Sequence, residues 1–343
     1  MNPRAVARPN RSSVLRGLSL AGGAAAVALV PIALGSSFWI YNVTLIAIYS
    51  VAVIGLNVLA GYVGIVSFAQ TAFMAVGGYG VAILTVSDHW NPWLSGALAV
   101  VLAGLLSMAV GVPLLRLRSH YLTMASFGLA IAVYYFSTGA SFTGGAVGIS
   151  AIPPLSIGGL SFGNAVPMEL LAVGVALVAL YLVSTLASSH VGRDWRAIAA
   201  REDVARSLGV RVFNRRLWAF VIASVLGAVS GVLYVEATSF VSPGLYSTTV
   251  MVNLFVMLFI GGRSRTTGPV VGAAVVLLVP ELFSSLSGME GIIFDALLIV
   301  IILFFPRGVV GGLVGLWNRL SFRLLRRDVL RETEVRQVEV VNE

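Results

Sequence analysis

The chain has 343 residues and a mass of 36.0 kDa; 58% of its residues are hydrophobic and only 10% are charged. A soluble globular protein has about 25% charged residues, so this chain has too little polar surface to form one. The composition therefore excludes a soluble enzyme, a disordered regulator and a nucleic-acid-binding domain. It predicts an all-α polytopic membrane protein, because helices satisfy their own backbone hydrogen bonds in lipid.

Apolar segments long enough to cross a bilayer recur along the chain, since one span needs about 20 apolar residues. We expect about ten transmembrane helices, near residues 17–35, 41–60, 69–86, 93–113, 121–138, 167–187, 217–238, 248–262, 268–285 and 291–305. The expected domain organisation is a cytoplasmic N-terminus (1–16), a transmembrane domain (17–305) and a cytoplasmic tail (306–343).

The basic residues predict the orientation of these spans. All 22 of them are arginine, and the formal net charge is +8. Cytoplasmic loops of membrane proteins carry an excess of basic residues. If the N-terminus is inside, every arginine falls in an inner segment and none falls in an outer loop. The inner segments are then 1–16, 61–68, 114–120, 188–216, 263–267 and 306–343. We therefore expect both termini to be cytoplasmic.

Two connections are longer than simple turns. The predicted outer loop 139–166 is uncharged and rich in glycine, serine and proline, whereas the predicted inner segment 188–216 is highly charged. A helix beginning near Asp194 would place Trp195, Ile198 and Ala199 on one face. This amphipathic pattern predicts a helix that packs one side against the spans.

A second short helix follows in the same inner segment. Glu202 or Asp203 can cap its start, because carboxylates stabilise helix N-termini, and Gly209 suits its end. A rigid, charged two-helix hairpin between two spans is an expected docking element for a cytoplasmic partner. The alternative is a surface helix that lies on lipid headgroups.

The tail 306–343 carries arginines at every fourth position from Arg319 to Arg331, with Leu320, Phe322 and Leu324 between them. This spacing predicts a basic amphipathic helix on the inner membrane surface.

No enzyme site is recognisable in the sequence. The three histidines, His89, His120 and His190, lie in different loops and lack metal-ligand spacing to one another or to a carboxylate. The chain has no cysteine, which excludes disulfides and thiolate chemistry, and it has no P-loop. We expect no cofactor in this chain and no partnership with nucleic acid.

The acidic residues within spans predict an energy source other than an ion gradient. Glu169, Glu236 and Glu281 are expected toward the outer ends of their helices, and Asp295 about one turn inside its own. Ion-coupled carriers place such groups deep in the bilayer. Because the middle of the membrane is free of charge, the pattern argues against a proton or sodium relay.

Uncharged polar residues on or beside the spans are the candidate substrate pathway. A neutral or zwitterionic solute needs hydroxyls, amides and exposed backbone rather than fixed charge. The candidates are Asn57, Ser67, Gln70, Thr71, Thr123, Ser126 and Asn253. The alternative is that each is an ordinary helix-packing residue.

Four stretches together resemble the LivM-type permease subunit of branched-chain amino acid ABC importers. The first is residues 61–73, GYVGIVSFAQTAF, and the second is Leu115-Arg116-Leu117-Arg118 with Tyr121-Leu122 and Thr143-Gly144-Gly145. The third comprises Gly192-Arg193, Arg196-Ala197-Ile198, Ala205 and Leu208-Gly209. The fourth comprises Ser242-Pro243, Gly261-Gly262, Gly268-Pro269-Val270, Gly272-Ala273 and Pro306-Arg307-Gly308.

This resemblance implies one half of a transmembrane pair in the inner membrane of a bacterial cell. The expected partners are a sister permease subunit, two cytoplasmic ABC ATPase subunits that bind ATP and Mg²⁺, an extracytoplasmic solute-binding protein and the lipid bilayer. The hairpin within 188–216 resembles the coupling helix that fits a groove in the ATPase. The coupling residues implied by the resemblance are Arg193, Arg196, Ala197, Ile198, Glu202, Ala205, Leu208 and Gly209.

The resemblance implies ATP-driven import, by alternating access, of branched-chain amino acids or a related small polar solute. Relatives of this fold move urea, amides and other small solutes, so the solute stays open at this point. The alternatives are a secondary carrier or channel for a small neutral or zwitterionic solute and a membrane-embedded enzyme.

Overall fold

The computed structural model describes residues 35–157 and 160–282. The segments 1–16 and 306–343, the predicted span 291–305 and all but the last residue of the predicted span 17–35 lie outside this part of the chain. The location of both termini therefore stays a prediction.

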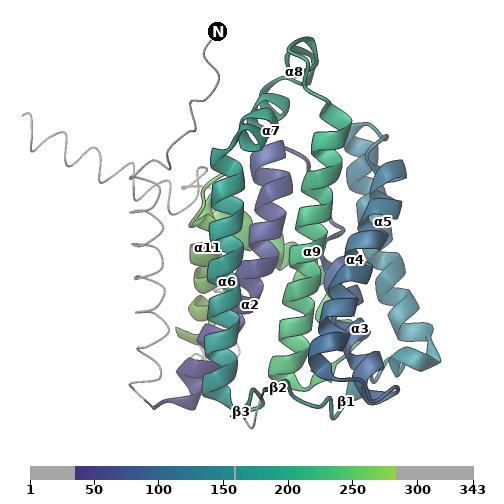
Figure 1. Cartoon of the computed structure of the whole chain (residues 1–343), viewed down its shortest axis with the longest axis vertical. Coiled ribbons are helices and arrows are strands. Elements are labelled where there is room, and N and C mark those ends of the chain that lie inside the picture. The colour runs from purple at the N-terminus through teal and green to yellow at the C-terminus, as the bar shows by residue number, and fades with distance from the viewer. Residues whose placement is uncertain (1–34, 158–159, 283–343) are drawn as a thin grey trace, which may run out of the picture.

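The described residues form a bundle of long apolar helices with short connections (Figure 1). In chain order the helices are α2 (Ser37–Leu56), its π-helical continuation η1 (Asn57–Val63), α3 (Gln70–Val86), α4 (Pro92–Leu114), α5 (Ser119–Gly139), α6 (Ala165–Ser188), α7 (His190–Ala200), α8 (Glu202–Ser207), α9 (Val212–Thr238), α10 (Thr248–Gly261) and α11 (Gly268–Leu282). Single turns of 3₁₀-helix lie at η2 (Ser141–Thr143) and η3 (Pro243–Tyr246).

A helix occupies each of the eight predicted spans that fall on described residues. Six helical segments are long and apolar enough to cross a membrane, and α3 and α11 are shorter apolar helices. Two helices begin four or more residues earlier than predicted, and α2 does so by four residues, at Ser37. Helix α9 begins at Val212, five residues earlier than the expected span, so Arg215 and Arg216 belong to its first turns.

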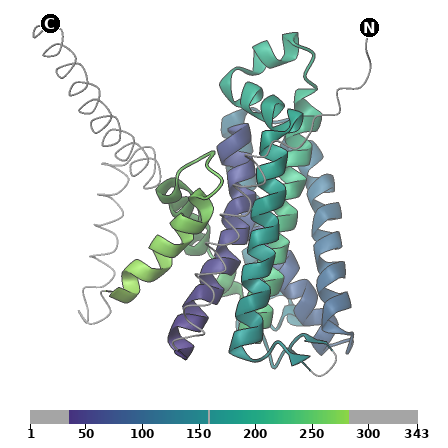
Figure 2. The same cartoon turned by 60° about the vertical axis from the view of Figure 1, so that its left-hand side comes forward.

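Helices α2 and α9 form the centre of the bundle. Helix α9 packs on α2, α3 and α4, and α2 packs on α6 and α11 (Figures 1 and 2). Small residues allow this approach. A Cβ atom added at Gly77 would lie 2.2 Å from the carbonyl oxygen of Ala228, and one added at Gly231 would lie 2.0 Å from that of Met74. Close backbone contact of this kind is how helices associate in membranes.

The two long connections lie at opposite ends of the bundle. Helices α7 and α8 lie at one end, and the strands of the 140–164 connection lie at the other (Figure 1). The described arginines all lie at the α7 end, in the 115–118, 189–211 and 262–267 connections and the first turns of α9. Among the described residues, the predicted separation of arginine-bearing inner segments from arginine-free outer loops is thus present in space.

Short strands are the one element type that the helical pattern did not predict. Strand β1 (Ile149–Ser150) pairs antiparallel with β4 (Phe240–Val241), and β2 (Ser156–Ile157) pairs with β3 (Leu160–Ser161). Both pairs satisfy backbone groups of the glycine-rich loop, and the β1–β4 pair joins the loop to the segment that follows α9.

Candidate functional site

Helices α7 and α8 form a hairpin, hereafter the α7–α8 hairpin, between the two spans α6 and α9. The side chain of Ser189 accepts a hydrogen bond from the backbone N–H of Val191 and so caps α7. Arg201, with φ −155°, separates the two helices and occupies the N-cap of α8. The prediction that Glu202 or Asp203 caps α8 was therefore wrong. Both carboxylates lie in its first turn instead, where their negative charge interacts favourably with the helix dipole.

The buried face of α7 differs by one residue from the predicted one. Gly192, Trp195 and Ile198 are buried, whereas Ala199 is exposed. Gly192 takes part because a Cβ atom there would lie 2.1 Å from the carbonyl oxygen of Ala187. A spacing of three residues keeps the buried positions on one helical face.

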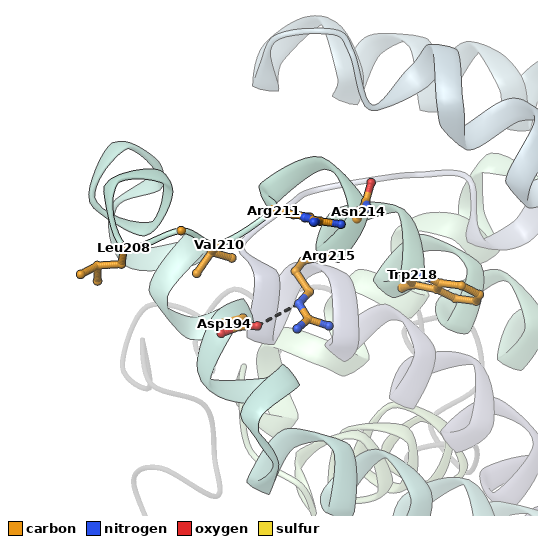
Figure 3. A pocket seen from close by; sticks show the side chains of 8 residues that line it. Asp194, Leu208, Val210, Arg211, Asn214, Arg215 and Trp218 are labelled. Carbon is orange, nitrogen blue, oxygen red and sulfur yellow. Dashed lines mark ion pairs between the residues drawn. The ribbon is translucent and has the colours of Figure 1, made fainter.

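Helix α7 is fixed to the first turn of α9 by two contacts with one residue. The Trp195 indole Nε1–H donates to the carbonyl oxygen of Arg215 at 3.1 Å, and the indole is fully buried. An ion pair joins Asp194 Oδ2 to Arg215 Nε at 2.8 Å, as Figure 3 shows. Displacing α7 therefore displaces the start of α9.

Further contacts fix the hairpin to α6 and to a second arginine of α9. Arg196 donates to the carbonyl oxygen of Ala187, in the last turn of α6, at 2.8 Å. Glu202 forms ion pairs with Arg206 of α8 and with Arg216 of α9. Side chains of α7 thus connect the hairpin to both flanking spans, and Glu202 connects α8 to α9.

The predicted coupling residues separate into an exposed and a buried group. Arg193, Arg196, Leu208 and Gly209 are exposed, and Leu208 is exposed by 74%. Ala197 and Glu202 are half-buried, whereas Ile198 and Ala205 are buried within this chain. Val204, an exposed apolar residue of α8 that the prediction omitted, joins Leu208 at the tip of the hairpin.

A hollow of about 530 Å³ lies between the hairpin and the first turns of α9. Figure 3 shows the paired Asp194 and Arg215 in its lining, with Trp218 further along α9. Leu208, Val210, Arg211 and Asn214 complete the labelled lining. The hairpin therefore presents a concave surface as well as a projecting tip.

The hairpin also contacts the segment that follows η1. Gly64 has φ +79°, and a Cβ atom there would lie 3.2 Å from the Cβ of Ala199. Residues 64–69 then run without helical structure to the start of α3. Non-helical backbone at membrane depth is tolerated only where protein covers it or where it lines a cavity.

Two predicted pathway residues hold this non-helical segment against α5. The hydroxyl of Thr123 donates to the carbonyl oxygen of Val66 at 3.1 Å. The hydroxyl of Ser126 accepts from the backbone N–H of Phe68 at 3.0 Å. The structure therefore brings these α5 hydroxyls to half-buried, non-helical backbone of the 64–69 segment.

Two predicted amides bind backbone elsewhere in the bundle. Gln70 Nε2 donates to the carbonyl oxygens of Ala52 and Ala223 at 2.9 and 3.2 Å, at the junction of α2, α3 and α9. Asn57 binds the α10–α11 turn, where it accepts from the Ser264 N–H and donates to the Arg265 carbonyl oxygen. Both amides fix helix junctions.

The other predicted pathway residues have fewer contacts. Ser67 is buried, and its hydroxyl accepts from the Ala69 N–H at 3.4 Å. The buried Thr71 hydroxyl has no hydrogen-bond partner among the described residues. Asn253 is half-buried on α10. These side chains retain hydrogen-bonding capacity.

Aromatic rings that the sequence argument missed surround the same segment. The ring of Phe68 lies 5.8 Å from Phe127 of α5 and 4.6 Å from Phe255 of α10, between centroids. The non-helical segment therefore lies between α5 and α10. No local pattern revealed this, because each helix contributes only one ring.

Of the three acidic residues expected toward outer helix ends, Glu169 and Glu236 are buried. Glu236 Oε2 accepts from the backbone N–H of Leu155 at 3.1 Å and thereby ties the outer loop to α9. Neither carboxylate oxygen of Glu169 has a hydrogen-bond partner within the described ranges. Glu281 is exposed near the end of α11, and Asp295 lies outside the described residues.

Comparison with known proteins gives a consistent result across most of the chain. The family model for the permease component of the branched-chain amino acid transport system matches residues 38–306. The permease LivM of the high-affinity branched-chain amino acid transport system of Escherichia coli K12 is 24% identical over 291 residues, which cover 78% of this chain and 68% of LivM. The permease LivH of the same organism is 24% identical over 292 residues, which cover 79% of this chain and 93% of LivH.

A relative with a different named solute also matches. The nucleoside ABC transporter permease protein NupC of Lactococcus lactis is 24% identical over 250 residues, which cover 66% of this chain and 75% of NupC. No solved structure matches the chain.

Proposed function

The chain belongs to the family of permease components of branched-chain amino acid transport systems, and from this premise we propose that it is the membrane-spanning subunit of an ATP-driven importer. It would act in the inner membrane of a bacterial cell and move its solute by alternating access. ATP hydrolysis would take place in two partner ATPase subunits, with a solute-binding protein outside. The α7–α8 hairpin, anchored to two spans and bearing exposed arginines, is the observation that carries this proposal.

A branched-chain amino acid is the proposed solute, because LivM and LivH are named for that transport. Such a solute is zwitterionic with an apolar side chain. The segment 64–69 offers backbone carbonyls beside the hydroxyls of Thr123 and Ser126, and the ring of Phe68 adds an apolar surface. A nucleoside is the second candidate, since NupC also matches and nucleosides stack on aromatic rings.

The proposed pathway runs along the side of the bundle where α5 and α10 flank this segment. Helix α5 is the least buried of the six long helical segments. Its exposed face includes Tyr121, Gly128 and Tyr135, whereas the exposed face of α4 is formed by leucines and valines such as Leu105 and Val101. An exposed glycine such as Gly128 allows a neighbouring helix to approach closely, so we place the sister permease subunit against α5.

The proposed coupling begins at the tip of the hairpin. Arg193, Arg196, Val204 and Leu208 are accessible for contact with an ATPase groove. Ile198 and Ala205, which the family resemblance also implied as contacts, would instead hold the two short helices against the spans.

Movement of the hairpin would then reach the pathway by two routes. One route runs through Asp194 and Trp195 to Arg215, and hence to α9. The other runs from Ala199 to Gly64, which begins the non-helical segment. Because Thr123 and Ser126 tie that segment to α5, a displaced hairpin would shift the flanks of the pathway together.

Charge reversal at the hairpin tests the docking step. Arg193→Glu should reduce co-purification of the partner ATPase several-fold, because it places a like charge where the native arginine meets its acceptor. Arg211→Glu is the matched control, since it makes the same charge change at an exposed arginine at the same end of the bundle, between α8 and α9. Equal ATPase recovery with Arg193→Glu and wild type, at equal membrane insertion, would contradict the proposal.

A further inference from the structure

A second hollow at the α7 end of the bundle has an unusual set of charges. Its volume is about 460 Å³, and it lies between the α4–α5 turn, the end of η1, α8 and the start of α9. Arg116 and Arg118 line it from the turn, Arg206 from α8 and Arg216 from α9. Glu202 is the only acidic residue among those that line it.

The single carboxylate leaves most of this positive charge unbalanced. Both oxygens of Glu202 are engaged, one by Arg206 and the other by Arg216. Arg216 Nε is buried and has no acceptor among the described residues. The guanidinium groups of Arg116 and Arg118 form no ion pair or hydrogen bond within the described part of the chain. The pocket therefore retains several donors for an anion.

The depth of the pocket indicates where such an anion would come from. η1 ends at Val63, α4 ends at Leu114, α5 begins at Ser119 and α9 begins at Val212, so four helix ends lie around it. Apolar side chains, among them Ile65, Leu115, Leu122 and Phe213, share the lining with the arginines. A wall that is apolar on one side and cationic on the other is typical of the headgroup level of a bilayer.

We propose that this pocket binds the phosphate of an anionic phospholipid from the inner leaflet. Guanidinium groups bind phosphate oxygens through paired, charge-assisted hydrogen bonds. Exposed apolar residues of α4 toward its end at the α4–α5 turn, Leu105, Leu106 and Met108, can accept the acyl chains. An acidic protein loop would need no such apolar surface, so the geometry favours a lipid.

The bound lipid would connect the α4–α5 turn to the hairpin, in addition to the direct packing of α4 on α9. Arg116 and Arg118 belong to the α4–α5 turn, whereas Arg206 belongs to the hairpin and Arg216 to α9. A phosphate held by both sets fixes the hairpin relative to α4. Occupancy would therefore depend on the anionic lipid content of the membrane, independently of which solute is transported.

Titration of the purified full chain with dioleoylphosphatidylglycerol, followed by native mass spectrometry, tests this site. The apparent Kd should rise about 5-fold for Arg116→Gln or Arg118→Gln and about 30-fold for the double variant, from the usual contribution of a basic residue near an anionic membrane. The double variant Arg201→Gln/Arg211→Gln is the control, because it removes two exposed arginines at the same end but outside this pocket. It should change the Kd less than about 2-fold.

Three outcomes would overturn the proposal. One is an unchanged phosphatidylglycerol Kd in the Arg116→Gln/Arg118→Gln variant, and another is an equal loss in the control. The third is a ligand preference that excludes an anionic lipid as the specific ligand. Either competition by inorganic phosphate as strong as that by phosphatidylglycerol, or binding of dioleoylphosphatidylcholine with the same Kd, would show this. If the double variant lost ATPase co-purification but kept lipid binding, the pocket would be a protein-docking site instead.

Discussion

Replacing Trp195 with alanine should detach the α7–α8 hairpin from the bundle while leaving the spans folded. The indole is fully buried, and truncation of a buried tryptophan costs about 3–5 kcal/mol. Loss of the Nε1–H bond to the Arg215 carbonyl oxygen is part of that cost. The adjacent Asp194–Arg215 ion pair cannot compensate, because its side chains are 25% and 31% exposed and such pairs contribute about 1 kcal/mol or less.

Limited trypsin digestion measures this detachment, because Arg193, Arg196, Arg201 and Arg206 lie within or between the two helices. If the free energy of opening the hairpin falls by about 3–5 kcal/mol, the rate of its cleavage should rise by roughly a hundredfold or more. The same variant, reconstituted with its ATPase partners, should hydrolyse ATP with less solute moved per ATP. Trp218→Ala is the matched control, since Trp218 lies at the same end but is 52% exposed, and its loss should cost about 0.5 kcal/mol. Equal cleavage of the two variants would refute the reasoning.

Two further predictions concern packing and the pathway. Gly231→Ala should lower Tm and the yield of monodisperse protein at a cost of about 1–3 kcal/mol, because its Cβ would lie 2.0 Å from the Met74 carbonyl oxygen. Gly174→Ala on α6 is the control and should be tolerated, because its added Cβ meets nothing within 4 Å. Equal Tm values for the two variants would count against the α3–α9 contact. Ser126→Ala removes the acceptor of the Phe68 N–H and should slow solute uptake at a stability cost of about 1–3 kcal/mol. Ser137→Ala, which loses only a bond to Val133 within α5, should not slow uptake; equal uptake by both variants would contradict the role of Ser126.

Hydrophobicity and charge predicted the spans because each depends on a local property. The length of an apolar run can be read directly from the sequence and compared with the thickness of the bilayer. The positions of the arginines can be read in the same way, and they mark one end of the bundle. The hairpin was predictable for the same reason, since Trp195 and Ile198 lie at a helical spacing within one short segment. The predicted buried face of α7 included Ala199 and omitted Gly192. A pattern of apolar residues does not reveal that Gly192 lies close to the backbone of Ala187, which is outside the helix.

The roles of the polar residues were less predictable, because their partners are distant in the sequence. Gln70 and Asn57 were selected for their amide groups, yet those amides bind the backbone of Ala223 and Ser264. Thr123 and Ser126 were selected with them and lie beside the non-helical segment 64–69. A hydroxyl or amide near a span has the same local signature in both situations, so only the three-dimensional arrangement separates them.

The most direct measurement is solute uptake into proteoliposomes that contain this chain, its sister permease and both ATPase subunits, with leucine and a nucleoside supplied through the solute-binding protein. The account predicts uptake that requires ATP on the side of the membrane that carries the ATPase subunits and that continues when proton and sodium gradients are collapsed. The account also predicts that uptake falls with Arg193→Glu but not with Arg211→Glu. Uptake that continues without the ATPase subunits and stops when an ion gradient is removed would contradict it and favour a secondary carrier.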